Sequence, residues 1–173
     1  MNLIKYTGKI HIDPEDFTNK HKVQKSWKKV SMIMFEGEMC EYYSWFISRR
    51  YNLTLNKPLR GAHISFINDS IKDLRQDDTK SLEDVELMWK QFKNKYDDVD
   101  IEIELDVDAR SNGEHWWLKP SEDSKIKLQN LRTELGLGNP YWNFHLSIGH
   151  ANEKNIAHSE YIVRMIENKL ITT

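Results

Sequence analysis

Apolar residues recur along the chain at two spacings, which predicts a mixture of strands and helices. Alternation of apolar and polar side chains is typical of a half-buried strand, and recurrence every three or four residues is typical of an amphipathic helix. Alternation or short apolar runs predict strands at residues 3–12, 29–35, 100–109 and 115–118. Helical spacing predicts helices at 37–50, 81–96, 121–135 and 153–170. This mixture, without the glycine signatures of repeated βαβ units, indicates an α+β fold.

Local signals support several of these boundaries. Ser81 with Asp84 three residues later forms a carboxylate version of a capping box, which predicts a helix start. Gly136 is expected to end the helix that begins after Pro120. We expect a turn at Asp13-Pro14, and residues 53–60 are expected to form a loop.

Two short segments, Gly61–Ile67 and Asn143–Gly149, are near copies of each other, with the sequences GAHISFI and NFHLSIG. In an extended strand successive side chains point to opposite faces, so His63 and Ser65 share one face while the apolar residues between them share the other. The second copy follows the same rule. Each segment therefore predicts a strand that is anchored in the core and presents an imidazole and a hydroxyl on its free face.

The candidate catalytic residues are His63, Ser65, His145 and Ser147. Two imidazoles can supply a base and an acid near neutral pH, and two hydroxyls can donate hydrogen bonds to phosphate oxygens. Together they would suffice to break a phosphate ester without a metal, and the residues do not indicate which histidine is the base. The alternative is two unrelated strand histidines, because a single His-x-Ser match is expected by chance in a chain with seven His.

Composition restricts the cellular setting. With 39% hydrophobic and 30% charged residues over 173 positions, the chain is typical of one globular domain spanning residues 1–173. No apolar run approaches the roughly 20 residues of a membrane span. The N-terminus lacks the features of a signal peptide, so we expect a cytoplasmic protein that does not bind membranes. The lone Cys40 is expected to pack rather than react.

The charge balance restricts the partner. A net charge of -2 without a long basic tract is poorly suited to a long nucleic acid, whose binding requires many Lys and Arg contacts to phosphates. A small nucleotide or an RNA end is the more suitable partner. The oligomeric state is left open.

The paired His-x-Ser motifs on two strands of a small α+β chain resemble the two-histidine (2H) phosphoesterase superfamily. This superfamily includes RNA 2′,3′-cyclic phosphodiesterases, 2′-5′ phosphodiesterases and phage anti-CBASS nucleases that degrade cyclic oligonucleotide signals. The resemblance implies a bilobal fold with two antiparallel-rich sheets flanked by helices around a central cleft. It also implies a metal-free mechanism without a cofactor, in which a ribose 2′-oxygen takes part.

Four further residues are candidates for binding the substrate. A turn at Ser111-Asn112-Gly113 predicts a hairpin that includes the strand at 115–118. Tyr141 and Trp142 directly precede the second motif, and Trp117 lies in this hairpin, so each is placed to stack on a base. Packing at the edge of the cleft is the alternative for these aromatics. Arg60 enters the first motif strand and is placed to bind a phosphate, or else forms a solvated strand end.

We expect no metal site. His115, His150 and His158 could be combined with Asp106 or Asp108, but their spacings match no helical or hairpin ligand pattern.

The sequence therefore predicts a metal-independent phosphodiesterase of the 2H type that acts on a small cyclic or oligomeric ribonucleotide. The Lys-, Asn- and Ile-rich composition and the small size favour a phage enzyme that destroys a cyclic oligonucleotide immune signal in the host cytoplasm. An RNA-end 2′,3′-cyclic phosphodiesterase is the alternative enzyme. A nucleotide-binding sponge that sequesters a signal without cleaving it is the alternative from another class.

Overall fold

The computed structural model describes residues 2–14 and 28–171 of the chain. Within these residues, strands and helices are mixed in the order that the sequence predicts, and the α+β class is confirmed. The strands are β1 (Leu3–Ile12), β2 (Lys28–Met34), β3 (Leu55–Asn56), β4 (His63–Ser70), β5 (Asp100–Ser111), β6 (His115–Pro120) and β7 (Leu146–Ala151). The helices are α2 (Met39–Tyr51), α3 (Ile71–Leu74), α4 (Leu82–Tyr96), α5 (Glu122–Glu134) and α6 (Ile156–Glu167).

These strands form one antiparallel 7-stranded sheet in the order β3-β7-β6-β5-β1-β2-β4. The expectation of two separate sheets is therefore wrong. The reason is β5, which pairs with β1 over Asp100–Asp106 and with β6 over Leu105–Ser111, so that one long strand joins both sides. We call β4, β2, β1 and residues 100–106 the first half-sheet, and residues 107–111, β6, β7 and β3 the second half-sheet.

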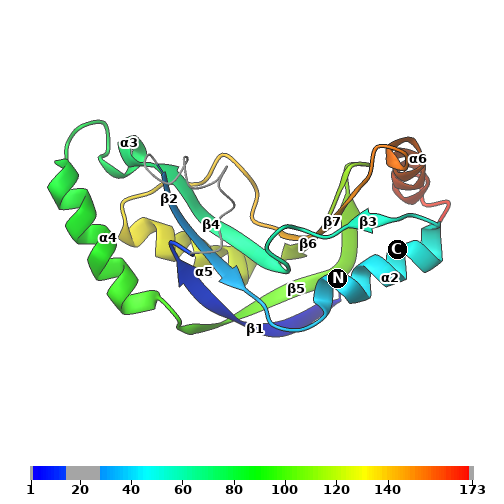
Figure 1. The fold of residues 1–173 in the computed structure, drawn as a ribbon, viewed down its shortest axis with the longest axis horizontal. Helices are drawn as coiled ribbons and strands as arrows, with labels where there is room; N and C mark the ends of the chain where they lie inside the picture. Colours follow the sequence, from blue (N-terminus) through cyan, green and yellow to red (C-terminus); the bar gives the residue numbers. More distant parts are fainter. Residues whose placement is uncertain (1, 15–27, 172–173) are drawn as a thin grey trace.

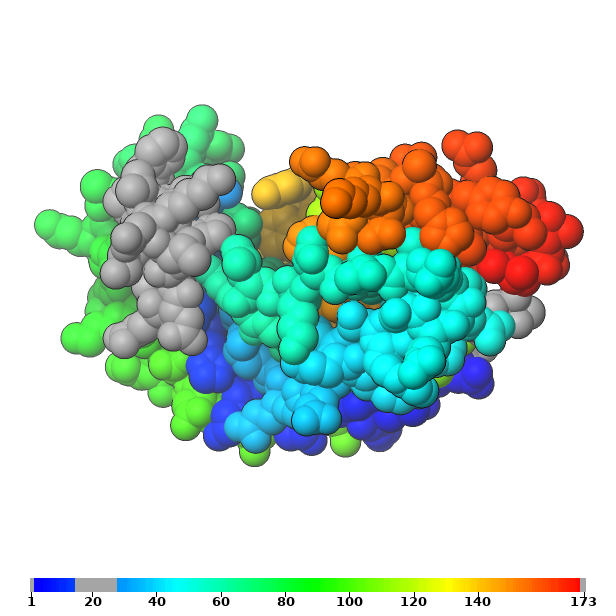
Figure 2. Space-filling model, turned by 45° about the vertical axis from the view of Figure 1, so that its right-hand side comes forward, coloured from blue at the N-terminus to red at the C-terminus, as the bar shows by residue number. Residues whose placement is uncertain are grey.

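The sheet bends so that its two motif strands approach each other. β4 is one edge of the sheet and β7 lies next to the other edge, yet residues of β4 and β7 lie close together in space. Figure 1 shows the molecule as a crescent in which β5 runs along the bottom from one half-sheet to the other. In Figure 2 the orange surface near residues 140–155 lies beside the cyan to turquoise surface near residues 55–65. Strand twist and β-bulges produce this kind of bending.

Helices cover the apolar side of the motif strands. Ile64 and Phe66 of β4 and Leu146 and Ile148 of β7 belong to the main core. α5 lies against β4, and α2 lies against β7. A small separate cluster, Val30, Met32 and Met34 of β2, lies outside this core. Both motif strands are therefore anchored from behind, as the alternation of their residues predicts.

Most predicted elements are present, with small changes at their ends. The capping box at the start of α4 forms as predicted: Asp84 N donates to Ser81 Oγ, and Ser81 N donates to an Asp84 carboxylate oxygen. Among residues 2–14 and 28–171, two elements were not predicted from the sequence, β3 within the expected loop and α3 after β4. A two-residue strand and a four-residue helix are too short to show a periodic pattern.

Candidate active site

The two motif strands have the same pattern of exposure. The segments His63–Asn68 and His145–His150 have the same order of exposure. In each, the first, third and sixth residues are half-buried, and the second, fourth and fifth are buried. His63 and Ser65 therefore share the accessible face of β4. Ser147 of β7 shares its face with His145, which directly precedes the strand. The faces assigned to the four motif residues from the alternation are those that the structure has.

A β-bulge follows the serine in each strand. In β4, Ser65 pairs with Met32 and Ile67 pairs with Ser31, so Phe66 is an extra residue. In β7, Ser147 pairs with Trp117 and Gly149 pairs with Trp116, so Ile148 is the extra residue. A bulge shifts the alternation by one position.

Because of this shift, Asn68 and His150 return to the face that carries the histidines. Asn68 lines the same cavity as the motif residues, a position that strict alternation along the strand did not predict. The signal was present in the sequence, since the two consecutive apolar residues Phe66 and Ile67 interrupt a strict alternation of apolar and polar residues.

Both histidine rings are oriented by the backbone in the same way. Nδ1 of His63 lies 2.9 Å from the Gly61 carbonyl oxygen, and Nδ1 of His145 lies 2.7 Å from the Asn143 carbonyl oxygen. A carbonyl only accepts, so Nδ1 carries the proton and donates in both contacts. Nε2 of each ring remains as the atom for proton transfer. Gly61 has a φ of +67°, a backbone conformation that glycine adopts without strain.

The four motif residues line one cavity of about 200 Å³. Asn68, Tyr141 and Trp142 complete its lining. The structure thus brings together residues from two segments that are far apart in the sequence. A cavity with two imidazoles, two hydroxyls, an amide and two aromatic rings can hold a phosphate beside a base.

The environment of His63 favours its neutral form. Burial lowers the pKa of His63 below the ordinary value of 6.5, and the positive charge of Arg60 and the nearby His145 lower it further. The hydrogen bond to Gly61 acts in the opposite direction but does not outweigh burial. A neutral imidazole with a protonated Nδ1 can accept a proton at Nε2.

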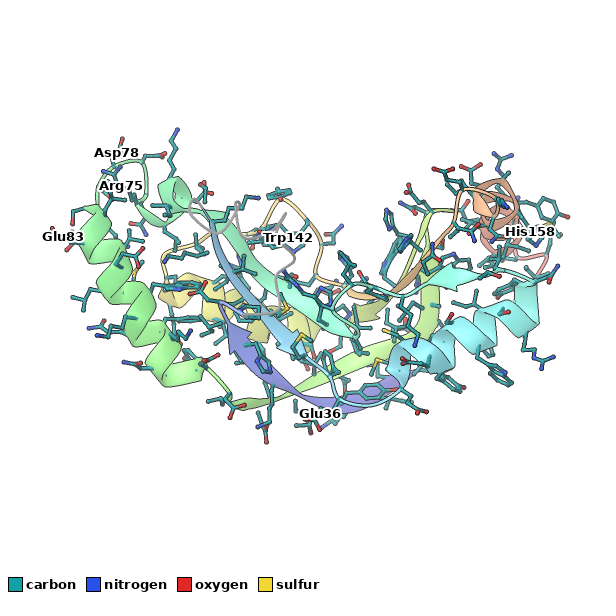
Figure 3. All side chains as sticks on the ribbon, viewed as in Figure 1. Glu36, Arg75, Asp78, Glu83, Trp142 and His158 are labelled. Atoms are coloured by element: carbon teal, nitrogen blue, oxygen red, sulfur yellow. The ribbon has the colours of Figure 1, made fainter. Side chains whose placement is uncertain are left out.

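Trp142 is held in the cavity wall by a network of contacts that the sequence pattern did not predict. Its Nε1 donates to the Ser65 carbonyl oxygen over 3.3 Å, and the Arg132 guanidinium lies 5.4 Å from its ring centroid. Arg132, which is only 1% exposed, makes two hydrogen bonds to the Asp69 carboxylate and one to the Phe66 carbonyl oxygen. Figure 3 shows Trp142 on the loop between α5 and β7.

The remaining predicted binding residues lie around this cavity. Tyr141 lines it and is 84% exposed, so its ring lies at the rim. Trp117 does not line it, but the Trp117 ring centroid lies 6.3 Å from that of His145. Arg60 also lies outside the lining, with Nη1 3.9 Å from Met32 Sδ, and it acts on the site through its charge on His63.

The residues considered for a metal site do not converge. His115 and His150 are paired across β6 and β7, whereas His158 lies on α6 with Nε2 2.8 Å from the Tyr51 carbonyl oxygen (Figure 3). Over residues 2–14 and 28–171, no group of three or more His, Cys, Asp or Glu side chains is arranged to hold a metal ion.

The chain matches no family model, no curated protein and no solved structure among those compared. In the part of the chain that the structure describes, no helix has the length and apolarity required to cross a membrane.

Proposed function

We propose that the protein is a phosphodiesterase that cleaves a small cyclic or oligomeric ribonucleotide by acid–base catalysis, without a metal ion. The observation that supports this proposal most strongly is the single cavity lined by both His-x-Ser motifs, with each Nδ1 engaged by a backbone carbonyl. That arrangement leaves two Nε2 atoms for proton transfer on a substrate bound between them.

His63 is assigned as the base of the first step. Its lowered pKa keeps Nε2 unprotonated at neutral pH, so it can take the proton from a ribose 2′-hydroxyl. The 2′-oxygen then attacks phosphorus and displaces the 5′-oxygen of the next nucleotide, which receives a proton from Nε2 of His145. The product carries a 2′,3′-cyclic phosphate. Water opens this ring when the two histidines exchange roles.

The other residues of the cavity bind the phosphate and the base. Ser65 and Ser147 hydroxyls donate to the non-bridging phosphate oxygens, on which charge grows in the transition state. Asn68 can add a third donor from its amide. Tyr141 and Trp142 stack on a base of the substrate, since both rings line the cavity.

The two half-sheets support a bilobal arrangement of the 2H type. Each half-sheet contributes one motif strand, and each of these strands carries a bulge directly after its serine. By this resemblance, the substrate that we favour is a cyclic oligonucleotide immune signal of the kind degraded by phage anti-CBASS nucleases. The site of action that fits this substrate is the cytoplasm of the host.

The first experiment tests the reaction and the metal together. The purified protein is incubated with EDTA and a panel of cyclic di- and trinucleotides, 2′,3′-cyclic mononucleotides and 2′-5′ oligoadenylate. We expect cleavage of at least one cyclic oligoribonucleotide that survives chelation, because the two histidines supply both proton transfers. Complete loss in EDTA with rescue by Mn²⁺ or Mg²⁺ would reject the mechanism.

The second experiment tests the internal nucleophile. An all-deoxy cyclic analogue has no 2′-hydroxyl to hold beside the phosphorus, so we expect it to bind and to remain uncut. Equal cleavage of both substrates would show that water attacks directly. Opening of 2′,3′-cyclic mononucleotides alone would favour an RNA-end enzyme. Tight binding of the ribonucleotide without any product would establish a sponge.

A further inference from the structure

A second cavity, which we call the Trp117 groove, lies beside the proposed active site. Its volume is about 470 Å³, within the usual range for small-molecule sites. Trp117 of β6 contributes an aromatic surface to its lining, and Val163 and Ile166 of α6 contribute aliphatic ones. The polar lining comes from Asp108, Arg110, Ser111, Lys119 and Glu167.

Trp117 connects this groove to the catalytic residues. Trp117 is paired with Ser147 on one side and with Arg110 on the other, and directly paired residues of antiparallel strands place their side chains on the same face. A row therefore runs from the second motif across β6 to β5. The Trp117 ring also meets that of His145 edge-on, so a group stacked in the groove would lie close to His145.

The charges of the groove suit a base better than a second phosphate. The cations Arg110 and Lys119 are offset by the carboxylates Asp108 and Glu167. Arg110 is already paired with the nearly buried Asp106 over 3.3 Å, which further reduces its attraction for an anion. Stacking surfaces with both donors and acceptors at the edge are the usual means of reading a base.

We propose that the Trp117 groove binds a guanine base of the substrate, one nucleoside away from the scissile phosphate. This inference rests on the proposed function, and it identifies the substrate as an oligonucleotide with at least two nucleosides. Guanine fits because its adjacent N1–H and N2–H donors can pair with the Glu167 carboxylate. Arg110 can donate to O6 and N7, the most common specific contact of arginine with a base.

The test compares cyclic dinucleotides that contain two guanines or two adenines. With the wild-type protein we expect kcat/KM to favour the guanine substrate by about tenfold or more. Glu167→Gln and Arg110→Gln should each remove most of this preference, mainly through KM. Glu160→Gln, a control on an exposed position of the same helix, should keep it. Thermal melting of each variant reports whether it folds.

Calorimetric titration of His63→Ala with the same two dinucleotides makes the test independent of turnover. If no ribonucleotide is cleaved, the proposed function fails, but a guanine preference in binding that Glu167→Gln removes still supports the groove. Equal affinity for both bases overturns the groove. A preference that survives both groove substitutions also overturns it. If Arg110→Gln weakens both dinucleotides equally while Glu167→Gln strengthens both, the groove binds a phosphate and the proposal is wrong.

Discussion

The two motif strands present their histidine and serine in the same way, but the backbone carbonyls of the two serines accept different hydrogen bonds. On β4, the carbonyl of Ser65 accepts from Trp142, whose ring lies against the buried Arg132. On β7, the equivalent carbonyl of Ser147 accepts from the Cys40 thiol over 3.7 Å, a weak contact. The face that carries the histidine and the serine is thus duplicated, whereas the contacts to the two serine carbonyls are not.

The neighbours of the two serines differ as well. Ser65 is paired with Met32, a fully buried residue of a small apolar cluster, so β4 is closed toward its neighbouring strand. Ser147 is paired with Trp117, beyond which lies the Trp117 groove. An asymmetric site suits a reaction in which one histidine accepts a proton while the other donates one.

The largest expected effect is the loss of either histidine. His63→Ala and His145→Ala should each lower kcat by about 10²- to 10⁴-fold, the usual contribution of a positioned acid or base. Initial rates on the substrate identified by the panel measure this effect, and circular dichroism checks the fold. Wild-type rates in one variant would show that its histidine is not required, so the two motif strands would not contribute equally to the reaction. Unfolding of both would favour two structural histidines.

The next-largest effect is expected from Arg132, which contacts the first motif strand, β4. Arg132→Met leaves the Asp69 carboxylate, whose side chain is 11% exposed, without its partner, so we expect a loss of about 3–5 kcal/mol in the free energy of unfolding. Lys95→Met is the matched control, because it breaks the surface pair with Glu134 and should cost about 1 kcal/mol or less. Urea denaturation measures both. Similar losses in the two variants would show that Arg132 does not hold the strand.

Arg132 also marks the limit of what the sequence could predict. The motif faces followed from period-two alternation, and most elements followed from apolar spacing and caps, because both depend on nearby residues. The single sheet did not follow, since the pairing of β5 with two partners is a long-range property. The ion pair between Arg132 and Asp69 links α5 to β4 and leaves no local signal. Asn68 lay between these cases, because its place in the cavity depends on a bulge that the adjacent residues Phe66 and Ile67 indicate.

A smaller effect is expected in the pH dependence of His63. Because its pKa is lowered in the folded protein, the acid limb of kcat/KM should lie below pH 6.5. The same shift affects stability. As pH falls below 6.5, the unfolded chain takes up the proton more readily than the folded one, so the wild type should lose stability. His63→Gln should lose less over this window, as measured by urea denaturation at several pH values. Parallel curves for the two proteins would contradict the burial of a neutral His63.

The smallest effect is expected from Cys40, which contacts the second motif strand, β7. Cys40 is 3% exposed, and burial raises the pKa of its thiol to about 11, so it donates a weak hydrogen bond and is not a nucleophile at neutral pH. Cys40→Ala should therefore lower the free energy of unfolding by only about 1 kcal/mol, a typical value for one weak contact and a small loss of volume. A thiol reagent such as DTNB should label the native protein at pH 8 far more slowly than the urea-unfolded chain. A loss in the free energy of unfolding as large as that of Arg132→Met would show that the two motif strands are supported alike. Rapid labelling of the native protein would show that the thiol is reactive. Either result would contradict the contrast between β4 and β7.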